Sequence, residues 1–234
     1  GVQEAKGQTK SASNQITAGL ATIGGAAVAG GIAAVGAGVA ALGGLLVSSA
    51  GPASDLAESL NAVGVVFGEG AEQIQAYGET AYKTVGLSNR QFNQLATVTG
   101  AFLQNVGFDA KGAGEETIRL AERASDMASV FNTDVTTALE AIQSGLKGEF
   151  NPLEQFGVKL NAAAIEARAL EMGLADSASE LTDSAKAAAA LELIYEQTAK
   201  TQGDFANTSD SAANAQKILG AQIENIRAQI GAAV

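Results

Sequence analysis

Apolar residues recur every three or four positions through most of the chain, which is the spacing of one face of an α-helix. The first such face comprises Leu56, Leu60, Val63 and Phe67, at positions i, i+4, i+7 and i+11. The run GVVF at 64–67 is the one β-like patch, and its surroundings are helical. We therefore predict an all-α fold of about seven or eight helices.

Capping and breaker residues predict where these helices begin and end. Gly51-Pro52 predicts a break, with Ser54 as the cap of the next helix. Ser88 and Gln91 have the spacing of a capping box. Further helices are expected at 71–85, 88–107, 115–131, 133–146, 161–172 and 182–203, with a turn-rich loop at 107–114 and a last helix after the cap cluster 207–210.

The last helix carries a regular apolar stripe. Leu219, Ile223, Ile226 and Ile230 follow one another at spacings of 4, 3 and 4 residues. This is the spacing of a coiled-coil seam, so we expect a C-terminal amphipathic helix with a coiled-coil-like stripe.

The region between Lys10 and Asp55 carries no charge. Within it, 16–50 is rich in Ala, Val, Ile and Leu and contains three Gly-Gly pairs. As one helix it would span roughly 50 Å, whereas a bilayer core needs only ~20 apolar residues. The segment is therefore long enough to cross a membrane once as a helix, or to form a hairpin that almost crosses twice.

Glycines in this segment recur at helical spacing, which would give a seam where another backbone can approach closely. A buried core helix, a disordered Gly/Ala linker and a self-associating or membrane-seeking segment are the three interpretations. The third is favoured because cores seldom use so few large side chains and linkers usually contain Ser and charge. The glycines expected to form the helix-packing or membrane face are Gly24, Gly31, Gly36, Gly38, Gly43 and Gly44.

Composition narrows the function classes. The net charge is −11 and the sequence pI is about 4.4, which argues against specific nucleic-acid binding because that requires basic patches. The chain contains no Cys and no His, which excludes disulfides, thiolate nucleophiles, Cys/His zinc sites and imidazole catalysis.

The remaining acidic and glycine-rich motifs do not predict catalysis. Glu115-Glu116 and the pair Asp134 and Glu140 lie in helix first turns or on polar faces, so we interpret them as solvated or capping acids. The glycine-rich run 24–31 lacks the Lys-Ser/Thr of a P-loop. We predict no enzyme activity, no catalytic residue, no cofactor and no metal site, and interpret as surface or ion-pair groups Arg119, Arg123 and Arg168.

These observations divide the chain into four segments. They are a polar lead-in (1–15), a hydrophobic Gly/Ala-rich, transmembrane-like helix or hairpin (16–50), a multi-helix domain (51–206) and a C-terminal amphipathic helix (207–234). Because Ala supplies much of the apolar content, the core per residue is thin, and we expect assembly as a homo-oligomeric helical bundle.

Two short elements in the second half of the chain point to a known family. The first, in GEFNPLEQFGVKL (148–160), comprises Pro152, Leu153, Phe156, Gly157 and Val158. The second comprises Gly203, Asp204 and Phe205, followed by Thr208, Ser209, Ala213 and Asn214. In this order they resemble the helical domain of tailed-bacteriophage tail tape measure proteins. The segment 86–147 and the apolar stretch ahead of it are also similar to that family, so the resemblance covers most of the chain.

The resemblance implies a structural virion protein. Such proteins are mostly helical, lie in the tail-tube lumen or tip, set tail length, and leave ahead of the DNA. Their expected partners are their own copies, with a trimer favoured, together with tail-tube and tail-tip or hub proteins and the host membrane on ejection. Full tape measures are much longer, so we expect this chain to be a segment of one or a short member.

The function hypothesis combines the residue patterns with the family resemblance. It is a structural tape measure protein of the virion that contributes to tail length control, tail assembly and genome ejection, with 16–50 inserting in the host envelope during infection. The alternative is an α-helical pore-forming toxin that holds a hydrophobic hairpin inside a soluble bundle, since the same uncharged stretch would suit it.

Overall fold

The structure, a computed structural model, describes the backbone of residues 38–233 and the side chains of residues 51–233. Every regular element in this range is a helix and none is a strand, so the all-α prediction is confirmed for the described residues. In chain order the α-helices are α2 (Gly38–Phe67), α3 (Ala71–Thr84), α4 (Asn89–Asn105), α5 (Ala110–Val130), α6 (Val135–Leu146), α7 (Asn151–Glu154), α8 (Ala162–Glu171), α9 (Asp183–Gln197), α10 (Asp204–Asn207) and α11 (Ala212–Ala232). Short 3₁₀ turns are η2 (Gly68–Gly70), η3 (Ala178–Glu180) and η4 (Ala199–Thr201).

The chain divides into two units. One is Ser54–Ile226, called here the helical unit, and the other consists of Gly1–Ala53 and Arg227–Val234. The helical unit contains α3 to α10 and the parts of α2 and α11 that lie within its bounds. In the other unit, the described residues belong to α2 and to the C-terminal end of the chain.

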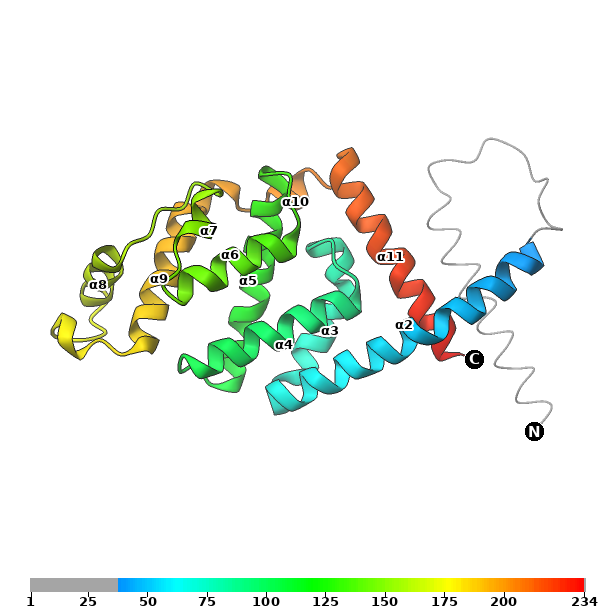
Figure 1. Ribbon diagram of the computed structural model, residues 1–234, viewed down its shortest axis with the longest axis horizontal. Coiled ribbons are helices and arrows are strands. Elements are labelled where there is room, and N and C mark those ends of the chain that lie inside the picture. The colour runs from blue at the N-terminus through cyan, green and yellow to red at the C-terminus, as the bar shows by residue number, and fades with distance from the viewer. Residues whose placement is uncertain (1–37, 234) are drawn as a thin grey trace. The chain divides into compact units, whose positions relative to one another are not determined.

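Helix α5 is the centre of the helical unit. It contacts α3, α4, α6 and α10, and in Figure 1 it lies in the middle of these neighbours. Its apolar positions are mostly Ala, which lets the neighbouring helices approach, while larger side chains fill the space between them. The largest fully buried side chains are Phe67, Phe92, Phe205, Ile74, Leu103, Leu120, Met127, Ile142, Leu153, Ile194, Val63 and Val85.

Helix α2 corrects one sequence prediction. Pro52 lies inside this helix, so the predicted break at Gly51-Pro52 and the role of Ser54 as a helix cap are wrong. The proline ring fixes φ near the helical value, although it removes one N–H donor and crowds the carbonyl group four residues earlier. The Ala, Leu and Val residues on either side supply enough helical turns to continue past that missing hydrogen bond.

The start of α4 confirms a local signal. The hydroxyl of Ser88 accepts the backbone N–H of Gln91 (3.2 Å), and the Gln91 side chain accepts the backbone N–H of Ser88 (3.0 Å). This reciprocal pair is the predicted capping box.

The start of α5 differs from the prediction. Oδ1 of Asp109 accepts the N–H of Gly112 (2.6 Å), and the helix begins at Ala110. The turn-rich loop predicted at 107–114 is therefore wrong from residue 110 onward. The glycines suggested a loop, but an N-capping aspartate and burial of the first turns start the helix there.

Of two later helices, α8 agrees with its predicted bounds and α9 is shorter than predicted. The predicted helix 161–172 is confirmed as α8, because Oδ1 of Asn161 accepts the N–H of Ala164 (2.8 Å). Thr182 caps α9 in the same way through Ala185 (3.1 Å). However, α9 ends at Gln197 rather than near residue 203.

The last helix turns an unexpected face toward the helical unit. Asn214 and Ala221, seven residues apart, are its buried positions in the range 212–226. Leu219 and Ile223 of the predicted apolar stripe are 43% and 39% exposed. These two stripe residues therefore do not form the contacts of α11 within the helical unit, and the coiled-coil stripe stays a prediction.

Candidate functional site

The first family-like element is a packed turn. Leu153, on α7, is fully buried, and its side chain fills the space that the missing side chain of Gly145 leaves on α6. Phe156 is also buried and meets the ring of Phe131 edge-on at a centroid distance of 5.5 Å. Gly157 has φ +74°, a conformation that favours glycine and turns the chain back after α7.

Pro152 stands at the start of that turn. It lies within the first two residues of α7, where its missing N–H would have no helical partner and its fixed φ suits the helix. The chain turns at 156–158, where the N–H of Val158 donates to the carbonyl oxygen of Leu153 (3.3 Å).

The second element is bound by a carboxylate that the sequence analysis did not select. Asp126, on α5, accepts the backbone N–H of Gly203 at Oδ2 (2.8 Å) and that of Phe205 at Oδ1 (3.1 Å). Asp126 is 9% exposed and Phe205 is 1% exposed. Gly203 has φ +81°, which lets both N–H groups point at one carboxylate.

Asp204 follows Gly203 at the start of α10 and faces its own helix. Its carbonyl oxygen and its side-chain Oδ2 both accept the hydroxyl of Thr208 (2.7 and 3.5 Å). The side chain of Asp204 thus takes no part in the bond between Asp126 and the turn.

Asn214 completes the second element through a buried polar network. Its Nδ2 donates to the hydroxyl oxygens of Ser129 (2.7 Å) and Thr208 (2.9 Å). Those two hydroxyls lie 3.1 Å apart and hydrogen-bond to each other. Asn214 therefore fixes the first turns of α11 to the end of α5.

The two elements meet the same end of α5. Asp126 and Ser129 bind the second element, and Phe131, the residue after α5, stacks on the first. The arrangement is that of two turns anchored at one helix end, and all the groups named serve packing or hydrogen bonding.

A row of polar contacts, called here the polar seam, extends along α5 toward its N-terminal end. The hydroxyl of Tyr195, on α9, donates to Oε1 of Glu116. Arg119 and Arg123 lie over the Tyr195 ring at 5.8 and 5.4 Å, and Arg123 also donates to the carbonyl oxygen of Thr198 (2.8 Å). Arg119 also pairs with Glu116 (3.4 Å).

The sequence predictions for the acidic residues and for the arginines of this region have different outcomes. Glu116 is buried, so the interpretation of it as a solvated or capping acid is wrong, whereas Glu115 is exposed and lies 3.9 Å from Lys111. Arg119 and Arg168 form ion pairs, Arg168 with Glu171 (3.3 Å) and Glu196 (2.5 Å), as expected.

The Tyr195 phenol should resist ionisation. Burial, and then the adjacent Glu116 carboxylate, raise its pKa above the ordinary value of 10.0. The unfolded chain loses this proton near pH 10 and the folded chain keeps it, so the stability that it contributes is complete below pH 10 and declines as the pH rises beyond it.

We expect Tyr195→Phe to leave the alkaline phenolate absorbance of the folded chain unchanged near pH 10. If the phenolate absorbance that this variant loses has its titration midpoint near pH 10, the assignment is wrong.

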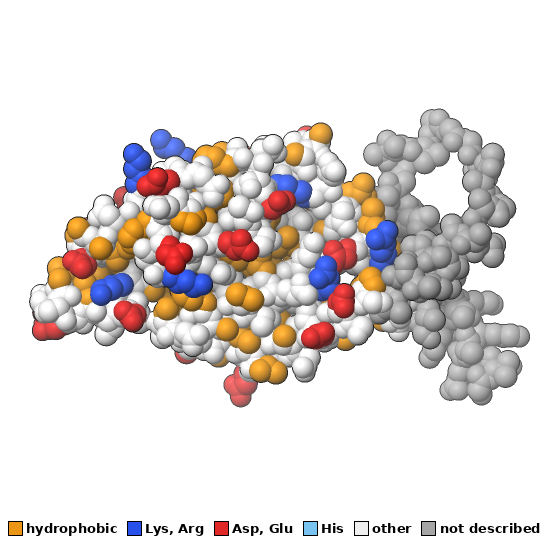
Figure 2. Space-filling model, in the orientation of Figure 1, with side chains coloured by type: hydrophobic (Ala, Val, Ile, Leu, Met, Phe, Trp, Pro, Cys, Tyr) orange, Lys and Arg blue, Asp and Glu red, His pale blue; other side chains and the backbone are white. Residues whose placement is uncertain are grey.

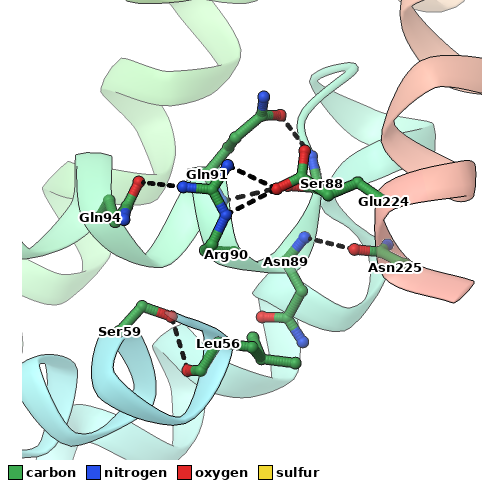
Figure 3. A network of polar contacts seen from close by, with 9 residues as sticks. All are labelled: Leu56, Ser59, Ser88, Asn89, Arg90, Gln91, Gln94, Glu224 and Asn225. Carbon is green, nitrogen blue, oxygen red and sulfur yellow. Dashed lines mark hydrogen bonds and ion pairs between the residues drawn. The ribbon is translucent and has the colours of Figure 1, made fainter. Parts of the chain in front are cut away.

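Helix α11 docks on α4 through polar groups (Figure 3). Arg90 forms an ion pair with Glu224, with both Nε and Nη2 2.6 Å from Oε1. The backbone N–H of Asn89 donates to Oδ1 of Asn225 (2.8 Å). Arg90 also donates to Gln94 (3.0 Å), which holds the guanidinium in place.

A further polar contact joins α11 to the loop before α6. Nζ of Lys217 donates to the carbonyl oxygen of Thr133 (2.8 Å). Partial burial lowers the pKa of Lys217, and the charge of Asp134 opposes that shift. The contact is therefore a charged hydrogen bond in a partly desolvated position.

A groove of about 790 Å³ lies beside these contacts. One wall is α11, with Gln216, Lys217 and Gly220, and the other comes from the starts of α4 and α6. Asp134 and Glu140, which the sequence analysis treated as solvated acids, both line it.

A second cavity, of about 430 Å³, lies among α4, α6, α8 and α9. Its floor is apolar, with Phe102, Phe150 and Ile165, and charges of both signs stand at its edge. Lys147 lies 5.3 Å from the centre of the Phe102 ring. The lining contains as many acidic as basic side chains, so neither sign of charge predominates.

The predicted glycine face is only partly described. Gly38, Gly43 and Gly44 lie in α2, whereas Gly24, Gly31 and Gly36 lie outside the described residues, as does most of the segment 16–50. Among the helices of residues 38–233, none has the length and hydropathy of a membrane span. The same residues contain no group of three acidic side chains placed to bind a metal ion.

Comparisons with known protein families, with curated proteins and with solved structures found no match to this chain. The residues of the two elements at 152–158 and 203–214 therefore remain the basis of the family resemblance.

Proposed function

We propose that this chain is a structural component of a tailed-phage virion: a tail tape measure protein, or a segment of one, packed as a homo-oligomeric helical assembly in the tail-tube lumen or tip. In this role it contributes to tail length control, tail assembly and genome ejection. The observation that carries the proposal is the pair of linked elements at 152–158 and 203–214. Their anchoring at the same end of α5 supports a scaffolding role for both.

The distribution of charge supports a protein that lets DNA pass. On the face shown in Figure 2, the described Lys and Arg side chains stand singly or in small groups among Asp and Glu. Together with a net charge of −11, this pattern would repel a phosphate backbone rather than bind it.

The exposed stripe of α11 supports assembly with other copies. Leu219 and Ile223 are exposed in the helical unit, and they continue in sequence through Ile226 and Ile230. Isoleucine at both seam positions of a coiled coil favours three or more strands. We therefore favour a trimer, with tail-tube and tail-tip or hub proteins as further partners.

The proposed site of action is the virion before infection and the host envelope during it. Segment 16–50 is expected to enter the host membrane on ejection, because no ionised side chain has to be desolvated there.

Location in the particle tests the structural part of the proposal. Antibodies against Ser54–Ile226 should label the tails of disrupted phage particles, and mass spectrometry of purified tails should recover peptides of this chain. Tails that lack the chain, from cells that express it, would contradict the proposal.

Liposome leakage tests the membrane part. We expect the purified chain to bind vesicles of bacterial phospholipids and release a trapped dye, while a variant lacking 16–50 does neither. Equal behaviour of the two chains would show that the segment has no membrane role, and would leave the structural part standing.

A pore-forming toxin with a hydrophobic hairpin is the second candidate, since an uncharged stretch from residue 11 to 54 suits that class equally. Lysis of intact cells by the purified chain, without a phage particle, would favour the toxin over the tail component.

A further inference from the structure

The core of the helical unit is complete without α11. The contiguous cluster of buried apolar side chains runs from Val63 to Ile194 and includes no residue of α11. In the range 212–226, Ala221 is the one buried apolar residue. Ile218 and Ile226 are half-buried, so removing this part of α11 would expose these two side chains and Ala221 but none of the largest fully buried side chains of the unit.

The attachment of α11 is polar and uneven along its length. Its first turn is fixed by the buried amide of Asn214. Further along, Glu224 and Asn225 bind α4 through an ion pair and one hydrogen bond at the partly exposed surface. Surface contacts of this kind contribute little and weaken as the salt concentration rises.

Between these two attachments, α11 is held by the hydrogen bond from Lys217 to the carbonyl oxygen of Thr133 and otherwise borders a groove. The groove of about 790 Å³ separates it from the starts of α4 and α6, and a well-packed helix interface would not leave such a space. At Gly220 no atom lies within 4 Å of where a β-carbon would stand. The distal part of α11 can therefore leave α4 without disturbing the core.

We propose that α11 is an exchangeable arm whose distal part, in the oligomer, docks on α4 of a neighbouring copy of this chain. The arm pivots about the turn that Asn214 anchors, which also breaks the hydrogen bond from Lys217 to Thr133. Glu224 then pairs with the neighbouring copy's Arg90, and Asn225 accepts the N–H of the neighbouring copy's Asn89. The inference rests on the proposed homo-oligomer and names the surface that joins its copies.

A second copy of this chain is the partner because the contacting groups of α11 and α4 are complementary. The acidic and amide side chains of α11 fit a guanidinium and a helix N-terminal N–H on α4, and every other copy presents the same pair. The contacts broken within one chain are re-formed between chains, so exchange changes little in contact energy. Because Leu219 and Ile223 lie on the exposed side, they stay free to pack against the stripe of another arm.

Single cysteines test the exchange directly, because the chain has no cysteine of its own. Asn89→Cys is prepared in one full-length chain and Asn225→Cys in a second that carries a mass label, and the two are mixed with a short bis-maleimide. We expect a covalent species joining the two chains, with a yield about tenfold or more above the control, since docking raises the effective concentration of the thiols. Because each chain carries a single thiol, the linked species contains one chain of each kind.

The control pair is Arg168→Cys with Glu196→Cys. These residues join α8 to α9 across an ion pair of 2.5 Å, and both helices belong to the packed unit, so mixed chains should not link. Since Asn89 accepts a hydrogen bond from the buried Asn93 (2.7 Å), Gln94→Cys provides a second α4 position that leaves this bond intact. Circular dichroism of each single variant checks that the fold is kept.

Two results would contradict the proposed exchange of α11 between copies. If the double variant Asn89→Cys/Asn225→Cys links only within one chain, and the mixed single variants give no more product than the control, the arm does not exchange. Should native mass spectrometry still find an oligomer, the proposed assembly stands and only the arm is wrong. A monomer at every concentration would remove both.

Discussion

Asp126→Asn should lower the free energy of unfolding by about 3 kcal/mol, because a buried charged acceptor of two hydrogen bonds is lost. The carboxylate receives the N–H groups of Gly203 and Phe205. An amide keeps one acceptor oxygen but turns an NH₂ group toward the second donor, so one buried N–H loses its partner. Urea unfolding followed by circular dichroism measures the loss, and the melting temperature should fall by roughly 6–12 °C.

Asp176→Asn is the matched control for that variant. It removes the same charge from an exposed position, and its effect should stay within about 0.5 kcal/mol. A loss in Asp126→Asn no larger than in the control would show that the two N–H bonds contribute nothing to stability.

Gly100→Ala should lower the free energy of unfolding by about 2 kcal/mol, although alanine is the better helix former. A β-carbon at this position of α4 would overlap the ring of Phe67, which is fully buried. The ring also lies against Gly114, on α5, at 3.7 Å from where its β-carbon would stand, so it has little space to move. The overlap therefore outweighs the gain in helix propensity.

Gly220→Ala makes the same chemical change in open space. It should cause no loss, and a gain of up to about 1 kcal/mol. In a Phe67→Leu background, the effect of Gly100→Ala should shrink because the ring is gone. An equal loss in both backgrounds would assign the effect to the backbone of α4 rather than to the ring.

Local signals in the sequence predicted much of the fold. The capping box at Ser88 and the Asn161 cap involve residues three positions apart, so their geometry is fixed within one turn of chain. The positions of α3, α6 and α8 follow from apolar spacing for the same reason. Pro52 misled the prediction because a breaker residue indicates a preference, and the longer helix on either side overrides it.

The candidate site was harder to predict because its partners are distant in the chain. Asp126 binds N–H groups 77 and 79 residues away, and backbone donors leave no trace in side-chain patterns. A single charge among Ala124, Met127 and Ala128 on the apolar face of α5 was the available signal. The docking face of α11 was missed because hydrogen-bonding residues show no hydrophobic period, whereas the exposed stripe does.

The seam along α5 gives the chain optical reporters of its own. There is no Trp and there are three Tyr, and the hydroxyls of Tyr77 and Tyr195 donate to Glu122 and Glu116 on α5. One phenol therefore senses the contact of α3 with α5, and the other senses that of α9. Replacing Tyr82 and either of these two by Phe leaves one phenol, whose ultraviolet signal follows the loosening of one helix without any added dye.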